Sequence, residues 1–226
     1  YVEKINILGN TVTNETVIRA ELLLDEGDPF NKLKLDQSMA KLKSKNIFGE
    51  IKNKITDGAN KGQKIIEIEI EEKPTGEISA GAGIGTNGGS FAFNVTENNW
   101  LGKGINVVTS LDVGSDVLTG ALKVTDPNYN FSGNSINYFL SSSSNKKDTS
   151  GFENKIITTG IGTSFEQYKD IYVSPSISLA LDNLKVSSTA SDSLKKQKGS
   201  FTDLSFNYGI AADKRNRVYD PTEGYI

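Results

Sequence analysis

From residue 77 onward, apolar and polar side chains alternate with a period of two through eight successive segments. Large aliphatic or aromatic residues occupy every second position, and Gly, Ser, Thr, Asn or Asp fill the positions between. In a β-strand this alternation puts the two kinds of side chain on opposite faces. The segments span residues 77–86, 90–98, 104–114, 117–126, 135–144, 154–164, 171–184 and 199–213. The pattern predicts an antiparallel sheet with one apolar face.

The lengths of these segments are typical of tilted membrane strands, which need about 9–11 residues. No run in the chain approaches the roughly 18 apolar residues of a membrane helix. The hydrophobic content is only 36%, which suits a membrane barrel because its strands need apolar groups on one face alone. We therefore interpret residues 77–226 as membrane barrel strands. A soluble β-sandwich is the alternative that this pattern leaves open.

The connections between the eight segments are of two alternating kinds. Residues 98–103, 126–131 and 166–170 carry aromatic side chains, which are enriched where a membrane protein meets the interface. Residues 145–150 and 186–198 form long loops that are hydrophilic and free of aromatics, whereas 87–89 and 114–116 are short. This alternation matches a barrel with turns at one rim and outward-facing loops at the other.

The first 73 residues differ in composition and hold 25 of the 53 charged residues. They predict a strand at 1–8, two helices, and strands at 50–55 and 64–70. We expect Thr13 or Asn14 to cap the first helix, which would carry Val17, Ile18, Leu22 and Leu23, and the second helix to begin near Asn31. Residues 1–73 thus form one domain, 74–76 a linker and 77–226 the other domain.

Several kinds of chemistry are excluded by residues that the chain lacks. It contains no histidine and no cysteine, which removes imidazole bases, thiolate nucleophiles and the usual zinc, haem and iron–sulfur ligands. A net charge of −3 offers no basic field for nucleic acid. We expect neither an enzyme nor a protein with a cofactor, a metal ion or a nucleic-acid partner.

Four passages carry a resemblance to a known family. They are residues 1–10, the run Glu72-Lys73-Pro74-Thr75-Gly76, the run from Glu97 through Asn99-Trp100-Leu101-Gly102 to Gly104, and 206–209 followed by 220–224. Together they resemble the last POTRA domain and first half-barrel of BamA-type outer-membrane protein assembly factors. The resemblance implies an α+β POTRA domain of order β-α-α-β-β, followed by about eight of a probable sixteen antiparallel transmembrane β-barrel strands. It also implies a bacterial outer-membrane location, with the POTRA domain in the periplasm.

The family's activity implies that the protein folds and inserts β-barrel proteins without a cofactor. The implied partners are unfolded outer-membrane proteins, accessory outer-membrane lipoproteins, periplasmic chaperones and the lipid bilayer. Two alternatives remain open at this point. One is a two-partner-type secretion pore of the same superfamily, and the other is a soluble two-domain β-rich binding protein.

Two strands are candidates for pairing with a client strand by β-augmentation. The first is the glycine-rich opening strand of the barrel, a weak seam or lateral gate whose candidate residues are Ile78, Ala80, Gly81, Gly83, Ile84 and Gly85. Alternatively, its glycines only relieve crowding inside the barrel. The second is a POTRA edge strand of Glu50, Ile51, Lys52, Asn53, Lys54 and Ile55, whose lysines also suit a strand that avoids pairing.

Two loops complete the candidate sites. The acidic residues Asp25, Glu26 and Asp28 are a candidate docking point for a basic accessory lipoprotein, or an ordinary loop at a helix end. Asn99, Trp100, Leu101 and Gly102 are expected to form a periplasmic turn at the membrane interface.

Overall fold

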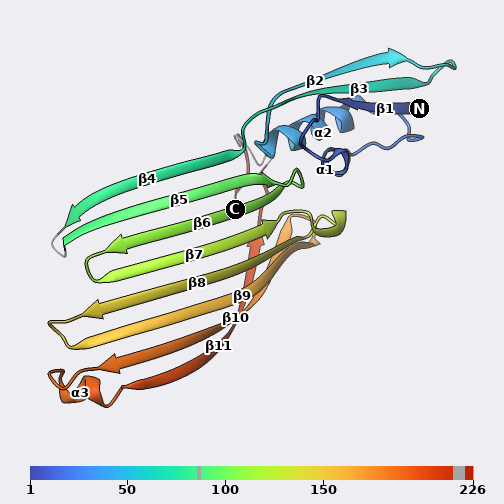
Figure 1. Cartoon of the computed structure of the whole chain (residues 1–226). Helices are drawn as coiled ribbons and strands as arrows, with labels where there is room; N and C mark the ends of the chain where they lie inside the picture. Colours follow the sequence, from blue (N-terminus) through green and yellow to red (C-terminus); the bar gives the residue numbers. More distant parts are fainter. Residues whose placement is uncertain (86–87, 216–221, 226) are drawn as a thin grey trace. The chain divides into compact units, whose positions relative to one another are not determined.

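A computed structural model describes residues 1–85, 88–215 and 222–225 (Figure 1). The chain divides into two compact units. The first contains residues 1–75 together with 98–105, and the second contains 76–97 and 106–215. Among the described residues, no helix has the length and apolarity needed to cross a bilayer.

The first unit is a three-stranded sheet with two helices. Its elements are β1 (Val2–Leu8), α1 (Glu15–Arg19), α2 (Lys32–Ser44), β2 (Phe48–Asp57) and β3 (Lys64–Glu72). The strand order is β1-β3-β2, with β1 parallel and β2 antiparallel to the central β3. The predicted order β-α-α-β-β is confirmed.

The core of this unit follows from the alternation in β3. Ile66, Ile68 and Ile70 are at most 3% exposed, while the glutamates between them lie on the other face. Their partners from the helices are Ile18, Leu35 and Leu42, all at most 2% exposed. Burying an isoleucine or leucine side chain stabilises the fold by roughly 1.5–3 kcal/mol.

The first helix is shorter than the sequence predicts. It ends at Arg19, so Leu22 and Leu23 lie beyond it. The chain turns after the helix and buries Leu24 instead, at 2% exposure, while Leu23 is 37% exposed. Asn14 occupies the N-cap position but makes no side-chain cap. The second helix begins as predicted, because the Asn31 side chain accepts a hydrogen bond from the Lys34 N–H.

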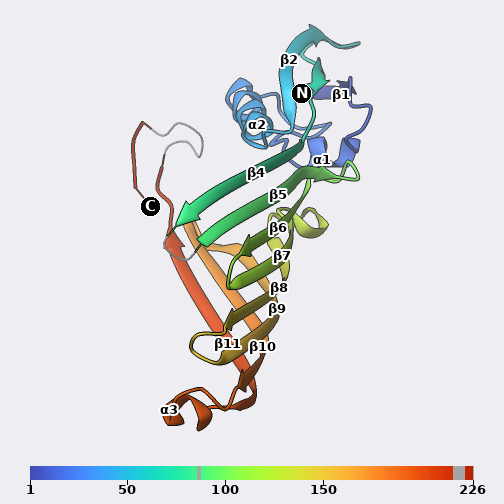
Figure 2. The same ribbon diagram turned by 60° about the vertical axis from the view of Figure 1, so that its left-hand side comes forward.

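The second unit is one sheet of eight strands in sequence order (Figure 2). The strands are β4 (Gly76–Gly85), β5 (Gly88–Trp100), β6 (Ile105–Gly114), β7 (Val117–Asp126), β8 (Ser135–Lys147), β9 (Phe152–Tyr168), β10 (Ile171–Val186) and β11 (Gly199–Ala212). All eight predicted segments are strands. Strands β8, β9 and β10 are longer than predicted, reaching 17 residues in β9, because pairing with their neighbours continues beyond the predicted ends.

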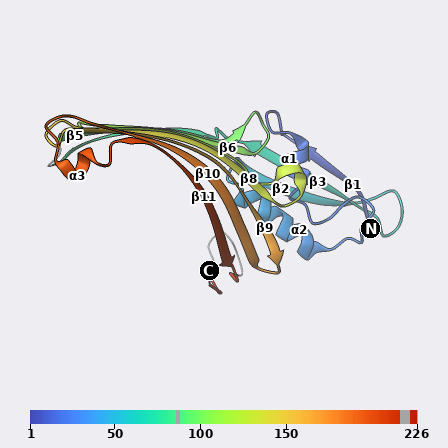
Figure 3. The same ribbon diagram turned by 90° about the horizontal axis from the view of Figure 1, so that it is seen from below.

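The register of these strands aligns the apolar residues into continuous rows. One row crosses six neighbouring strands through Val107, Val124, Tyr138, Ile161, Ile177 and Phe206. A row on the opposite face, three residues further along β6, holds small or polar residues: Ser110, Ala121, Ser141, Thr158, Ala180 and Asp203. The sheet is curved along its strands (Figure 3). The face that carries the first row is thus apolar across the six strands from β6 to β11.

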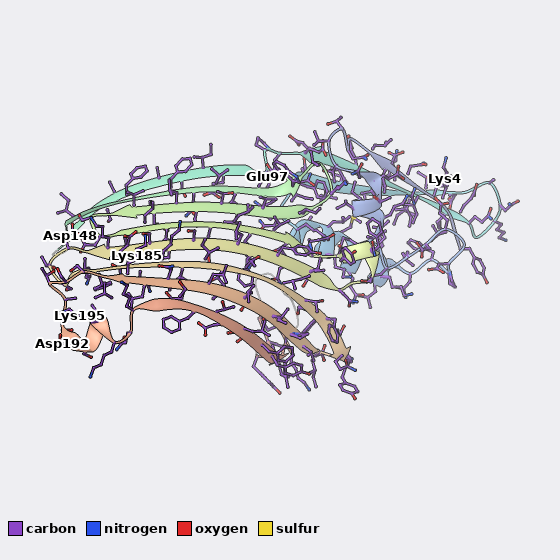
Figure 4. All side chains as sticks on the ribbon, turned by 60° about the horizontal axis from the view of Figure 1, so that its bottom comes forward. Lys4, Glu97, Asp148, Lys185, Asp192 and Lys195 are labelled. Atoms are coloured by element: carbon purple, nitrogen blue, oxygen red, sulfur yellow. The ribbon has the colours of Figure 1, made fainter. Side chains whose placement is uncertain are left out.

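The loops that connect the strands lie at two opposite ends of the eight-stranded sheet. The labelled Asp148, Lys185, Asp192 and Lys195 lie at one end, and Glu97 lies toward the other (Figure 4). The charged end includes a short helix, α3 (Asp192–Lys195), in a segment that the sequence predicts as a loop. The opposite end includes the 3-10 turn η1 (Tyr129–Phe131). The long hydrophilic connections 145–150 and 186–198 therefore lie at one rim and the aromatic connections at the other, as the alternation predicts.

Candidate functional site

Strand β4 is an edge of the eight-stranded sheet, with only β5 beside it among the described residues. Its aliphatic face is bare: Ile78 is 71% and Ile84 is 96% exposed. On its other face, Gly81 pairs with Ala92 and Gly83 with Ser90, so side chains are small on both strands. The candidate seam residues Ile78, Ala80, Gly81, Gly83, Ile84 and Gly85 thus lie on one edge strand that presents an unpaired backbone.

The glycines of β4 are not required by the space around them in the described structure. A Cβ atom built on Gly81 or on Gly85 meets nothing within 4 Å, and one on Gly83 meets only the Ser90 hydroxyl at 3.3 Å. None of the three has a positive φ. Glycine in a strand weakens it and leaves no side chain to hold the register. Relief of crowding therefore does not account for these glycines within residues 76–215.

Strand β2 is an edge of the three-stranded sheet, and its backbone is open. Among the described residues, no group outside β3 is hydrogen-bonded to the backbone of Glu50–Ile55. Ile51 points into the core at 9% exposure, while Lys52 and Lys54 face solvent opposite Glu69 and Glu67 of β3. The Glu50 carboxylate lies 2.9 Å from the Lys52 amine and raises the pKa of that lysine.

The other edge of that sheet, β1, is closed by the chain itself. The Val2 N–H donates to the Asp28 carbonyl, and the Gly27 N–H donates to the Val2 carbonyl, each at 2.8 Å. The Ile5 N–H donates to the Glu26 carboxylate at 3.0 Å, and the Ile5 carbonyl accepts from the Arg19 guanidinium at 3.0 Å. The first unit therefore offers a free strand edge at β2 and a covered one at β1.

The acidic loop is involved in this covering. The Glu26 carboxylate is held by Ile5, and the Asp28 carboxylate accepts from the Asp25 N–H at 3.1 Å. These bonds give two of the three candidate docking carboxylates a local structural role. Docking of a lipoprotein at Asp25, Glu26 and Asp28 stays a prediction.

The predicted interface turn divides into a buried and an exposed part. Trp100 is 49% and Leu101 is 71% exposed, whereas Asn99 is only 7% exposed. Asn99 lies against Thr13 of the first unit, and Gly102 approaches Val12 so closely that a Cβ atom would meet the Val12 carbonyl. Sequence reasoning missed Thr13 and Glu72, which hold this turn.

Two family models cover the chain. The POTRA model, described as a surface antigen variable number repeat, matches residues 1–73, and the Omp85 superfamily domain matches residues 99–226. The second match covers more than half of the chain. The chain belongs to the Omp85 superfamily.

Named relatives agree with this assignment. The outer membrane protein assembly factor BamA of Neorickettsia risticii is 28% identical over 99% of this chain, and BamA of Neisseria meningitidis serogroup B is 26% identical over 100%. Each match covers 31% of the relative, so the chain spans about a third of the length of these Omp85 proteins.

Solved structures show the same fold. The structure of BamA from Haemophilus ducreyi lacking POTRA domains 1–3 matches 99% of this chain and 46% of that chain, with a TM-score of 0.77 and 21% identity. CdiB from Escherichia coli matches 92% of this chain and 41% of that chain, with a TM-score of 0.64 and 15% identity. The predicted fold, a POTRA domain followed by antiparallel strands of a partial barrel, is confirmed. As an Omp85 protein it belongs to the bacterial outer membrane, with its POTRA domain in the periplasm.

We expect the POTRA domain to lose stability when the β1 edge is uncovered. Replacing Arg19 by Ala leaves the Ile5 carbonyl without its charged donor, which costs on the order of 1 kcal/mol at this half-exposed position. Amide exchange of the β1 strand, converted to a free energy of opening, measures the loss. Lys32→Ala is the control, since its pair with Asp36 is more exposed, and a loss as large as that of Arg19→Ala would contradict the prediction.

Proposed function

We propose that this chain is the client-handling part of an outer-membrane protein assembly factor, which folds and inserts β-barrel proteins into the outer membrane. The observation that carries the proposal is the edge strand β4, which has no strand partner on one side within residues 1–85, 88–215 and 222–225 and whose glycines have room for a Cβ atom. The BamA relatives, which are named as assembly factors, support the same role.

In this proposal, β4 acts by β-augmentation. An unfolded client strand needs partners for its backbone groups before it enters lipid, because unpaired N–H and C=O groups are costly there. An open strand edge supplies a row of such partners. Glycines on the other face of β4 leave the register of the pairing loosely specified, which allows clients of different sequence to use the same edge.

The open edge of β2 suits an earlier step, in which the POTRA domain receives the client in the periplasm. Its alternating pattern places Lys52 and Lys54 on the solvent face and Ile51 in the core, so an added strand would extend the sheet without disturbing the core. Because β1 is covered at Val2 and Ile5, the added strand is directed to β2 alone. Accessory lipoproteins, periplasmic chaperones and client proteins are the partners that this role requires.

The proposal is tested with the natural protein that contains this sequence, reconstituted in liposomes. An unfolded β-barrel client is added, and its insertion is followed by heat-modifiable migration. A photo-crosslinking residue is placed at Ser79 in β4, with Ser143 in the interior strand β8 as the matched position. We expect insertion that depends on the protein and crosslinks to the client at Ser79 but not at Ser143. Insertion no faster than into empty liposomes would overturn the proposal.

A further inference from the structure

The turn that joins β5 to β6 has a backbone that must be held in place. Leu101, Gly102 and Gly104 have φ values of 55°, 70° and 66°, which lie in the left-handed region. That conformation is disfavoured for a residue such as leucine, which has a Cβ atom. A turn with a left-handed leucine and an exposed Trp100 persists when its surroundings hold it there.

Asn99 supplies two of the bonds that hold the turn. Its side-chain amide donates to the Thr13 hydroxyl at 2.8 Å, and its side-chain oxygen accepts from the Gly104 N–H at 2.7 Å. Both side chains are nearly inaccessible, at 7% for Asn99 and 3% for Thr13. The Asn14 N–H adds a bond to the Gly102 carbonyl at 2.8 Å. The turn is therefore tied to the segment that precedes α1.

That segment is in turn held by Glu72 at the end of β3. One carboxylate oxygen accepts from the N–H groups of Thr11 and Val12 and from the Thr11 hydroxyl, at 3.0, 2.8 and 2.7 Å. The other accepts from the Thr13 N–H at 2.6 Å. Four donors on one carboxylate order the loop, because hydrogen bonds to a charged group are stronger than those between neutral groups.

We propose that Glu72, Thr13 and Asn99 form a polar clasp that positions the start of the β4–β5 pair for client insertion. Its members act as positioning residues, since none of them lies on β4, the proposed client edge. This inference rests on the function proposed above.

The path from the clasp to β4 is short. The Asn98 backbone and side-chain N–H groups both donate to the Thr75 carbonyl at 3.2 Å, directly before β4 begins at Gly76. Gly76 then pairs with Glu97 in the β4–β5 register. Residues 98–105 belong to the same compact unit as residues 1–75. Holding Asn99 thus also holds Asn98 and Thr75, the residues directly next to the first Gly76–Glu97 pair.

The test replaces single hydrogen-bonding groups of the clasp in the reconstituted natural protein. Thr13→Val deletes the hydroxyl that accepts from Asn99 while keeping the shape of the side chain. Thr13→Ser retains the hydroxyl, and Thr16→Val removes an exposed hydroxyl from α1 as a matched control. Asn99→Asp is a second clasp variant, which keeps an acceptor for Gly104 but replaces the donating amide with a charged oxygen in a nearly inaccessible site, where a charge is costly. Amide exchange of Asn14 and Gly104 and the rate of client insertion are measured for each.

We expect Thr13→Val and Asn99→Asp to speed exchange of the Asn14 and Gly104 amides by about tenfold, as local opening becomes easier. Client insertion should slow by several-fold in the same two variants, while Thr13→Ser and Thr16→Val stay at the wild-type rate. Released amides with an unchanged insertion rate would overturn the positioning role and leave the proposed function intact. Unchanged amides would overturn the clasp itself. If the wild-type protein inserts no client, the proposed function fails and the amide result still decides whether the clasp exists.

Discussion

Valine in place of Gly81 and Gly85 is expected to slow client insertion by about 10- to 30-fold. Each change adds a β-branched side chain to a strand, where the difference in β-propensity reaches about 1 kcal/mol. Two such changes raise the cost of opening the seam by about 2 kcal/mol, and each 1.36 kcal/mol is tenfold in rate. Both positions accept a Cβ atom without contact inside 4 Å, so the effect is not one of misfolding.

The control for this pair is Gly120→Val in the interior strand β7. That glycine is also in a strand and its Cβ atom would meet only the Ser110 carbonyl, at 4.0 Å. The valine at this position strengthens a strand with which the client is not expected to pair, so insertion should proceed at the wild-type rate. The measurement is the insertion rate of one client in liposomes, with protein folding verified by heat-modifiable migration. An insertion rate in the Gly81→Val/Gly85→Val protein equal to that of wild type would show that β4 is not a gate.

Protonation of Glu72 is expected to destabilise the loop before α1. Burial by itself raises the pKa of this carboxyl, but the hydrogen bonds from Thr11, Thr13 and Val12 outweigh it and lower the pKa from 4.5 to about 2. A pKa that is lower in the folded state means that the unfolded state binds more protons between these two values. The stability from Glu72 is thus fully present above pH 4.5 and is lost as the pH falls toward 2.

Glu72→Gln tests this directly. At pH 7 the variant should lose on the order of 1 kcal/mol in the free energy of opening of the POTRA domain, because solvent screening at this partly exposed carboxylate reduces the roughly 1.4 kcal/mol that each pKa unit would give. Amide exchange of β3 gives that free energy. The difference from wild type should shrink as the pH is lowered from 5 to 3. Glu71→Gln, on the exposed neighbour, should change little at any pH, and a gap for Glu72→Gln that stays constant with pH would refute the assignment.

The sheet and most of the POTRA domain were predictable because they depend on local periodicity. Alternation in β3 identifies Ile66, Ile68 and Ile70 as core, and the same period of two locates all eight barrel strands. The end of α1 was predicted wrongly, because Leu22 and Leu23 continue a helical spacing after the backbone has turned at Ala20. Burial of Leu24 by the rest of the domain outweighs that local preference.

The edge strands of the two sheets and the polar clasp were harder to predict, since they depend on which distant segments of the chain come into contact. Period-two alternation predicts β2 and β4 as strands, and the strand order among the described residues shows that each lies at the edge of its sheet. Glu26 looks from the sequence like one of three free acids in a loop, yet its carboxylate covers Ile5 in β1. Thr13 looks like a helix cap, and its hydroxyl accepts from a residue 86 positions away.

By itself, the sequence determined a charged α+β domain followed by eight strands with one apolar face, because side-chain alternation is a property of neighbouring residues. It also identified the glycine-rich strand that opens the barrel. Only the tertiary structure decided that the glycines of β4 have space around them, that β1 is covered while β2 is open, and that Glu72, Thr13 and Asn99 meet. Those facts depend on contacts between residues that are distant in the chain, which the folded backbone alone brings within hydrogen-bonding distance.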